Sequence, residues 1–177
     1  MQHRTPYELR VHIYQGRHLP APDFNGLCDP YIKVHFNGLE GRETERQNKT
    51  CDPKFYTTIT FDCALPAIEY APQINLQVWD HDLPPKSPDY IGCFNYELKN
   101  AELSRPDDLD EGSPPDPKWF QLMREQPGDS EGEILASFEL IPKDTPDQEL
   151  AKSPRLKPTT TKATVEIIAL GMRNMQP

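Results

Sequence analysis

The sequence lacks an excess of basic residues, and this excludes several partners. Its 177 residues include 19 lysines and arginines against 28 aspartates and glutamates, which gives a formal net charge of −9. A general nucleic-acid binder needs a basic face to neutralise phosphates, so we expect no nucleic-acid partner. The same charge opposes simple adsorption to an anionic membrane. Any such partner therefore requires a local positive patch or a bound cation.

Long hydrophobic runs are absent as well. The longest purely apolar run is residues 167–170, far short of the ~20 residues that cross a bilayer. The first residues contain no apolar stretch of the kind found in secretory signal peptides. The 4 cysteines have no metal-type CxxC spacing. They could form two disulfides, but without a secretion signal we expect reduced thiols and a cytoplasmic domain.

Motifs of the common enzyme classes are missing too. We find no GxSxG, Walker loop, HExxH or paired cysteine and histidine, so we expect no enzyme. The pair of aspartates at positions 80 and 82 does not begin an EF-hand loop, because Pro85 stands where that loop needs glycine.

What the sequence does have is a repeated alternation of apolar and polar residues. Residues 7–13 alternate strictly, with Glu8, Arg10 and His12 as the polar positions, and this predicts a half-buried strand. Further strands are predicted at residues 32–36, 44–49, 55–61, 74–78, 90–96, 119–122 and 134–140, with one helical turn near 101–103. Eight strands separated by turn residues predict an all-β, antiparallel sandwich.

The composition changes after residue 141. Residues 142–162 are rich in proline, lysine and threonine without periodicity, which is typical of a linker. Residues 163–172 predict a strand and a glycine turn that have no partner in the remaining sequence. We therefore predict one domain over residues 6–141, a linker over 142–162, and the incomplete start of a following domain in 163–177. Cutting the chain after Lys143 is then expected to leave the domain intact.

Five aspartates occur in two long polar connections, residues 16–30 and 80–89. They are Asp23 and Asp29 in the first connection and Asp80, Asp82 and Asp89 in the second. Asp80 and Asp82 continue the inward parity of the strand before them, so both are expected just beyond the core. Calcium takes roughly 6–8 oxygen ligands, and five carboxylates at one end of a sandwich would suit it. Aspartate also favours turns, which is the alternative for any single one of them.

Four short motifs carry a family resemblance. Residues 26–34 (GLCDPYIKV) resemble the G-x-x-D-P-Y-x-x-V signature of C2 domains, and residues 50–55 (TCDPKF) resemble their T-x-N-P-x-W turn, with Asp52 and Phe55 as departures. Residues 78–82 (VWDHD) and 89–92 (DYIG) resemble the calcium loop and the strand that follows it. The strand order resembles the circularly permuted, type II topology. Residues 132–141 and 165–175 resemble the end of one ferlin C2 domain and the start of the next.

The resemblance implies a function and a set of ligands. It implies calcium held by the side chains of Asp23, Asp29, Asp80, Asp82 and Asp89, assisted by the backbone carbonyls of Pro22 and His81. Because six residues separate Asp82 from Asp89 where five are usual, Asp89 is expected to be the weakest ligand.

At the level of the whole protein, the resemblance implies a calcium-dependent phospholipid-binding module of a membrane fusion or repair protein. Such a module works at the cytoplasmic face of a membrane, and its parent protein is expected to be anchored in that membrane outside this fragment. The expected partners are anionic phospholipid, fusion proteins and neighbouring C2 domains. The alternative is a C2 sandwich that mainly binds protein without calcium.

Two further groups of residues are candidates for membrane contact. Phe24, Leu27 and Leu83 flank the predicted ligands and could insert into the bilayer, where each would contribute about 1.5–3 kcal/mol, or could pack back onto the loops. Arg42, Arg46, Lys49 and Lys54 fall on the third and fourth predicted strands, which bind phosphoinositides in some C2 domains. Interleaved glutamates favour a mixed, solvated face instead.

Overall fold

The structure is a computed structural model, and it describes residues 4–21, 26–109, 113–123, 132–166 and 168. Its strands are β1 (Thr5–Arg17), β2 (Pro30–Phe36), β3 (Arg42–Glu43), β4 (Lys54–Leu65), β5 (Gln73–Asp80), β6 (Asp89–Glu97), β7 (Glu102–Leu103), β8 (Lys118–Gln121) and β9 (Glu133–Pro142). Three short 3-10 turns join them: η1 (Ile68–Tyr70), η2 (Leu98–Asn100) and η3 (Pro106–Asp108).

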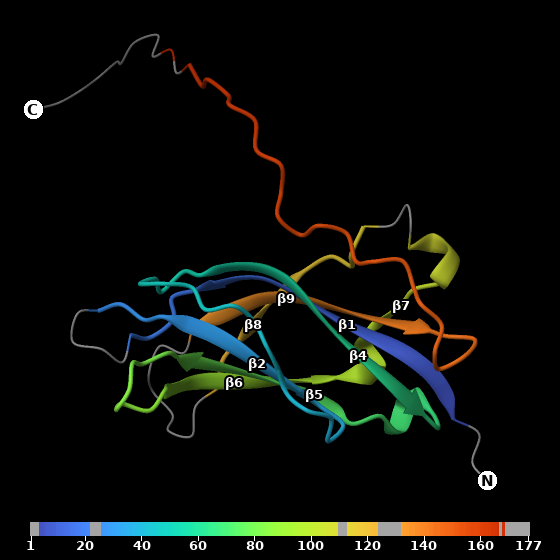
Figure 1. The fold of residues 1–177 in the computed structure, drawn as a ribbon. Helices are drawn as coiled ribbons and strands as arrows, with labels where there is room; N and C mark the ends of the chain where they lie inside the picture. Colours follow the sequence, from blue (N-terminus) through green and yellow to red (C-terminus); the bar gives the residue numbers. More distant parts are fainter. Residues whose placement is uncertain (1–3, 22–25, 110–112, 124–131, 167, 169–177) are drawn as a thin grey trace, which may run out of the picture.

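These strands form two stacked sheets (Figure 1). Sheet A has the order β4–β1–β9–β7, with β8 also paired to β9, and sheet B has the order β3–β2–β5–β6. The first strand pairs with the last, with Leu9 opposite Leu140, as a type II order requires. The predicted all-β sandwich is therefore confirmed.

The core lies between the sheets, where alternating apolar side chains meet. Leu9, Val11 and Ile13 of β1 are fully buried, and β5 contributes Ile74, Leu76 and Val78. These are the inward positions that the alternation predicted, since every second side chain of a strand points to the same face.

Two predicted elements differ in the structure. No strand covers residues 44–49, since β3 ends at Glu43. The Thr44 hydroxyl oxygen accepts the Ile32 backbone N–H at 3.0 Å, which interrupts the regular ladder at this point. The helical turn expected near 101–103 lies earlier in the chain, at η2, and residues 102–103 form β7 instead. Since β7 runs parallel to β9, the sandwich is antiparallel except at this two-residue pair.

The outer face of sheet A is less exposed than the alternation predicted. Arg10 and His12 are only 2% and 0% exposed. Residues 150–156, which we call the covering segment, lie against β1 and β4. The Arg10 Nη2 donates to the Ala151 carbonyl, and the Thr58 and Ser153 hydroxyls are 3.1 Å apart. Part of the predicted linker thus packs on the domain, and the domain boundaries stay a prediction.

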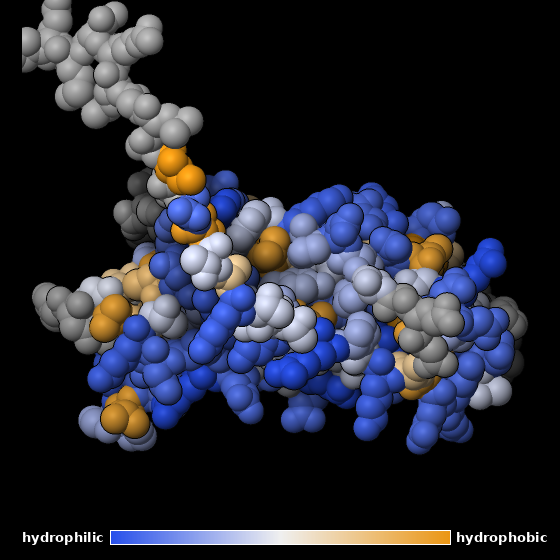
Figure 2. All heavy atoms as spheres, turned by 90° about the horizontal axis from the view of Figure 1, so that it is seen from above, coloured by the Kyte–Doolittle hydropathy of each residue, from blue (hydrophilic) through white to orange (hydrophobic). Residues whose placement is uncertain are grey.

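The structure describes residues 163–166 and 168 of the predicted terminal strand, and these residues form no strand. Val165 and Ile168 are 82% and 68% exposed there. Seen from the side of the covering segment, the surface is mainly hydrophilic, with apolar residues scattered over it (Figure 2).

Candidate functional site

The two polar connections lie at the same end of the sandwich (Figure 1). The pairing of β2 with β5 places Pro30 opposite Asp80, and the pairing of β5 with β6 places Asp80 opposite Asp89. Antiparallel pairing therefore brings the start of β2, the end of β5 and the start of β6 to the same end of the sandwich. The calcium hypothesis requires this arrangement.

Among the described residues at this end, Asp80 is the most deeply buried charged group, at 1% exposed. Its Oδ1 accepts a hydrogen bond from the Asp29 backbone N–H at 2.6 Å. The Oδ1 of Asp29 in turn accepts the Lys49 backbone N–H at 2.6 Å. The bond from the Asp29 N–H compensates part of the cost of burying the Asp80 carboxylate, and it ties the first connection to the end of β5.

Lys86 brings together the other two described aspartates. Its Nζ lies 3.0 Å from Asp82 Oδ1 and 3.0 Å from Asp89 Oδ2. The side chain of Asp82 is 11% exposed, and its second oxygen, Oδ2, is buried without a hydrogen-bond partner. A buried carboxylate oxygen in this state calls for a cation or a donor.

The additional residue between Asp82 and Asp89 is accommodated by the loop itself. Asp89 is still the first residue of β6 and stands directly opposite Asp80 in the ladder. In this register the additional residue does not separate Asp89 from Asp80, and directly opposed residues are close neighbours on one face of a sheet.

The described residues do not by themselves form a complete metal site. Within them, no group of three or more histidine, cysteine, aspartate or glutamate side chains is close enough to hold an ion. Predicted ligands Pro22 and Asp23, and the predicted membrane contact Phe24, lie outside the described residues. The donors that are described are carboxylate oxygens, which calcium prefers, and one of them is buried and unpartnered. Their chemistry fits a hard divalent cation.

The side chain of His81 contacts a basic residue rather than a carboxylate. Its Nδ1 lies 2.9 Å from Arg46 Nη1, and its backbone N–H donates to the Asp29 carbonyl at 3.0 Å. The latter bond is a second connection between the two loops.

The four basic residues predicted to bind phosphoinositides do not line one face. Arg42 lies over the Phe61 ring, 5.2 Å from its centroid, while Arg46 contacts the second loop. Lys49 is outside the strands, and Lys54 begins β4 in sheet A. Arg42 and Lys54 thus lie on the third and fourth strands, whereas Arg46 and Lys49 lie in the connection between them, and phosphoinositide binding by these residues stays a prediction.

A cluster of a cation and aromatic rings on sheet B was not predicted. The Lys33 Nζ lies 5.6 Å from the Tyr31 ring and 5.4 Å from the Trp79 ring, and Trp79 is 5.1 Å from Tyr90. Lys33 also pairs with Glu43 at 3.1 Å. The ladder places Tyr31, Trp79 and Tyr90 side by side on three strands. Their parity, opposite to that of the buried Ile32, Val34 and Val78, is the sequence signal that could have identified them.

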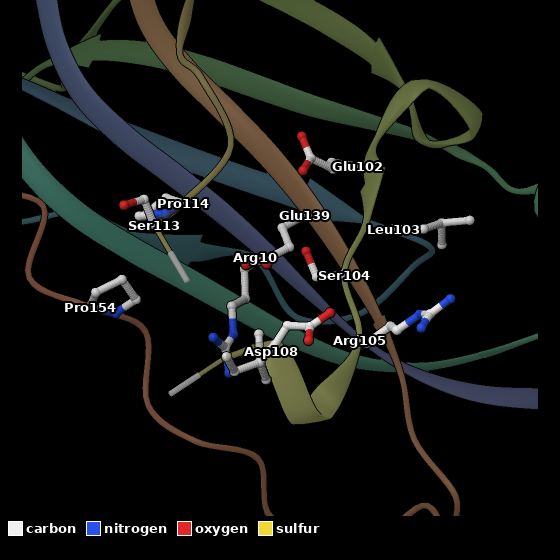
Figure 3. A pocket seen from close by; sticks show the side chains of 11 residues that line it. Arg10, Glu102, Leu103, Ser104, Arg105, Asp108, Ser113, Pro114, Glu139 and Pro154 are labelled. Carbon is white, nitrogen blue, oxygen red and sulfur yellow. The ribbon is translucent and has the colours of Figure 1, made fainter. Parts of the chain in front are cut away.

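A cavity of about 270 Å³ lies away from the loops, between the η3 segment and the outer face of sheet A (Figure 3). Arg10 of β1, Glu139 of β9 and Asp108 of η3 line it. Burial opposes ionisation of Glu139, but hydrogen bonds to His12 and Ser104 and the Arg10 charge outweigh it and hold the Glu139 pKa below its usual value. Acidic and basic groups compensate each other here, so we assign this cluster a structural role.

Comparison with known proteins decides the family. The profile of the C2 domain matches residues 7–122, which is most of the chain. The chain belongs to the C2 domain family. This C2 domain is 26% identical to Ferlin 1 of Toxoplasma gondii over 174 residues, covering 97% of the chain and 12% of that relative. It is 27% identical to mouse myoferlin over 192 residues, covering 96% of the chain and 9% of the relative.

Solved structures agree on the fold of this C2 domain. A C2 domain of plant Extended Synaptotagmin 1 superposes with a TM-score of 0.60 at 15% identity, covering 78% of this chain and 96% of that one. Human GIVD cytosolic phospholipase A2 gives a TM-score of 0.56 at 16% identity, covering 81% of this chain but only 17% of the enzyme. The C2 match and the ferlin similarity point to a non-catalytic module. In the described residues no helix is long and apolar enough to cross a bilayer.

Proposed function

We propose that this C2 domain binds calcium between its two polar loops and then attaches to anionic phospholipid, as a module of a ferlin-like protein of membrane fusion or repair. The observation that supports this most is the convergence of Asp82 and Asp89 on a single cation, Lys86, while Asp82 keeps a buried oxygen without a partner. Carboxylates held in this way offer oxygens to a stronger cation.

Charge explains why calcium would control membrane attachment. A domain with a net charge of −9 is repelled by an anionic leaflet. Two calcium ions would add four positive charges next to the aspartates and could accept lipid phosphate or carboxylate oxygens as remaining ligands. The proposed setting is the cytoplasmic face of a membrane, where anionic lipids concentrate.

Apolar residues beside the carboxylates would strengthen the attachment. Leu83 is 74% exposed directly after Asp82, and Leu27 is 38% exposed two residues before Asp29. An exposed leucine next to a charged site is poorly placed in water but well placed at a bilayer interface. Moving the Leu83 side chain into that interface would contribute about 1.5–2.5 kcal/mol.

Co-sedimentation with vesicles tests this function. We expect binding to vesicles of phosphatidylserine and phosphatidylcholine in calcium, and none in chelator, in magnesium, or with phosphatidylcholine alone. Leu83→Ala should weaken the vesicle binding about ten- to seventyfold and leave calcium affinity in solution unchanged. Leu103→Ala is the matched control, because Leu103 is 60% exposed but lies on β7, opposite Leu140 and away from the loops.

Two results would change the assignment. Calcium at a hundredfold excess over its dissociation constant should stabilise the domain by about 2.7 kcal/mol, so a melting curve insensitive to calcium would refute the calcium site. Calcium binding without vesicle binding would instead favour the alternative of a protein-interaction domain.

A further inference from the structure

We propose that Lys86 is a built-in counter-ion of the calcium site, which pairs with both Asp82 and Asp89 in the calcium-free domain and is displaced when calcium binds. Lys86 then sets the calcium affinity of the domain. This inference rests on the proposed function, since it concerns how the same carboxylates exchange one cation for another.

The local backbone positions Lys86 for this role. The Lys86 N–H donates to the Leu83 carbonyl at 3.2 Å, which closes a turn inside the loop between β5 and β6. The turn directs the lysine back toward the loop's two ends. There its Nζ meets Asp82 Oδ1 and Asp89 Oδ2, each at 3.0 Å. An ammonium group carries three donors on a flexible stem, so one lysine can serve both carboxylates.

The surroundings explain why a counter-ion is needed. Asp89 stands directly opposite Asp80 in the ladder, and Asp80 is 1% exposed. Like charges directly opposite each other destabilise a sheet. The Lys86 ammonium relieves this repulsion in the absence of metal. At 47% exposed, its side chain can swing into water without disturbing the core.

Calcium and the ammonium compete for the same oxygens. A calcium ion lies about 2.3–2.6 Å from its carboxylate ligands, and a positively charged nitrogen cannot keep its 3.0 Å contacts to two of them. Binding therefore includes the cost of breaking both ion pairs, and the apparent affinity is lower than that of the bare carboxylates. Because Lys86 is released in the calcium form, its charge contributes stability only to the calcium-free form.

Two substitutions of Lys86 test the competition. Lys86→Met keeps a long unbranched side chain and removes the charge, while Lys86→Arg keeps the charge. We expect Lys86→Met to raise calcium affinity about tenfold in calorimetry, equivalent to two partly exposed ion pairs. It should also lower the melting temperature in chelator, while the calcium-saturated variant should melt like the wild type. Lys86→Arg should resemble the wild type in all three measurements.

Arg46→Met controls for the general effect of removing a positive charge at this end. Arg46 contacts the His81 ring rather than a carboxylate, so we expect a smaller change in calcium affinity and no loss of stability in chelator. Equal effects of Lys86→Met and Arg46→Met would overturn the inference. If the wild type binds calcium but Lys86→Met changes neither the calcium affinity nor the melting temperature, the inference is overturned and the proposed function still stands. Absence of calcium binding in both proteins would overturn the proposed function, and this inference with it.

Discussion

Removing the covering segment tests whether it belongs to the domain. The sequence pattern predicts that a chain ending at Lys143 melts normally, because residues 142–162 resemble a linker. The structure leads to the opposite expectation. Without residues 150–156, the Arg10 Nη2 loses its acceptor, the Ala151 carbonyl, and the Thr58 hydroxyl loses Ser153.

The burial of Arg10 determines how much stability the truncated domain should lose. The residue is 2% exposed, its Nε is held by Glu8 at 2.6 Å, and its Nη1 already has no hydrogen-bond partner. A hydrogen bond from a charged donor contributes about 1.5–3 kcal/mol. For a domain of this size each kcal/mol corresponds to about 2–4 °C, so the melting temperature should fall by about 3–12 °C.

Thermal melting followed by circular dichroism compares two truncated chains. One ends at Leu156 and keeps the covering segment, and we expect it to melt like the whole chain. The other ends at Lys143 and keeps the Lys143 contacts with Asp62 and Pro6. If both melt at the same temperature, the covering segment contributes nothing and the boundary drawn from the sequence is right.

Two further predictions concern carboxylates. Asp80→Asn and Asp89→Asn should each weaken calcium binding at least about tenfold in calorimetry, because the charge of the ligands determines the calcium affinity. The control Asp107→Asn on η3 should have no effect. An Asp89→Asn protein with normal calcium affinity would mean that the loop insertion displaces that ligand. Folding lowers the Glu139 pKa from its usual value of 4.5, so the ionised carboxylate stabilises the folded state at pH values above 4.5. This contribution to stability is lost as the pH falls below 4.5. Urea unfolding of Glu139→Gln should therefore depend less on pH in this acid range than that of the wild type, and parallel curves would contradict the assignment.

The sequence predicted the elements whose signal is local. Alternation identified the inward residues of β1 and β5, and its continuation placed Asp80 at the edge of the core. The family motifs carried the order of the strands and the position of the two loops. These features depend on neighbouring residues, so a single sequence contains them.

Features that depend on distant segments were not predictable in the same way. Arg10 is a polar position of an alternating strand, yet it is buried because residues from beyond the last strand pack on it. His12 is buried between Thr58 of β4 and Glu139 of β9, which its ring nitrogens contact at 2.9 and 3.3 Å. The Thr44 hydroxyl, rather than any pattern of hydrophobicity, interrupts the predicted third strand. Lys86 carries no sequence signal of its own, and its contacts with two aspartates depend on the turn that its backbone N–H closes on Leu83.

The pairing of the first strand with the last also determines how the domain responds to tension. Tyr7 pairs with Pro142 at one pole of the sandwich, and Arg17 pairs with Glu133 at the other, beside the loops. A pulling force applied through the two ends of the chain enters at the Tyr7 pole and loads the ladder one pair at a time, which is an unzipping geometry. The covering segment would detach first, then the Lys143 bond to Pro6 would open, and β9 would peel from β1 toward the loops. Under force, the end of the sandwich that contains the aspartate loops would therefore unfold last.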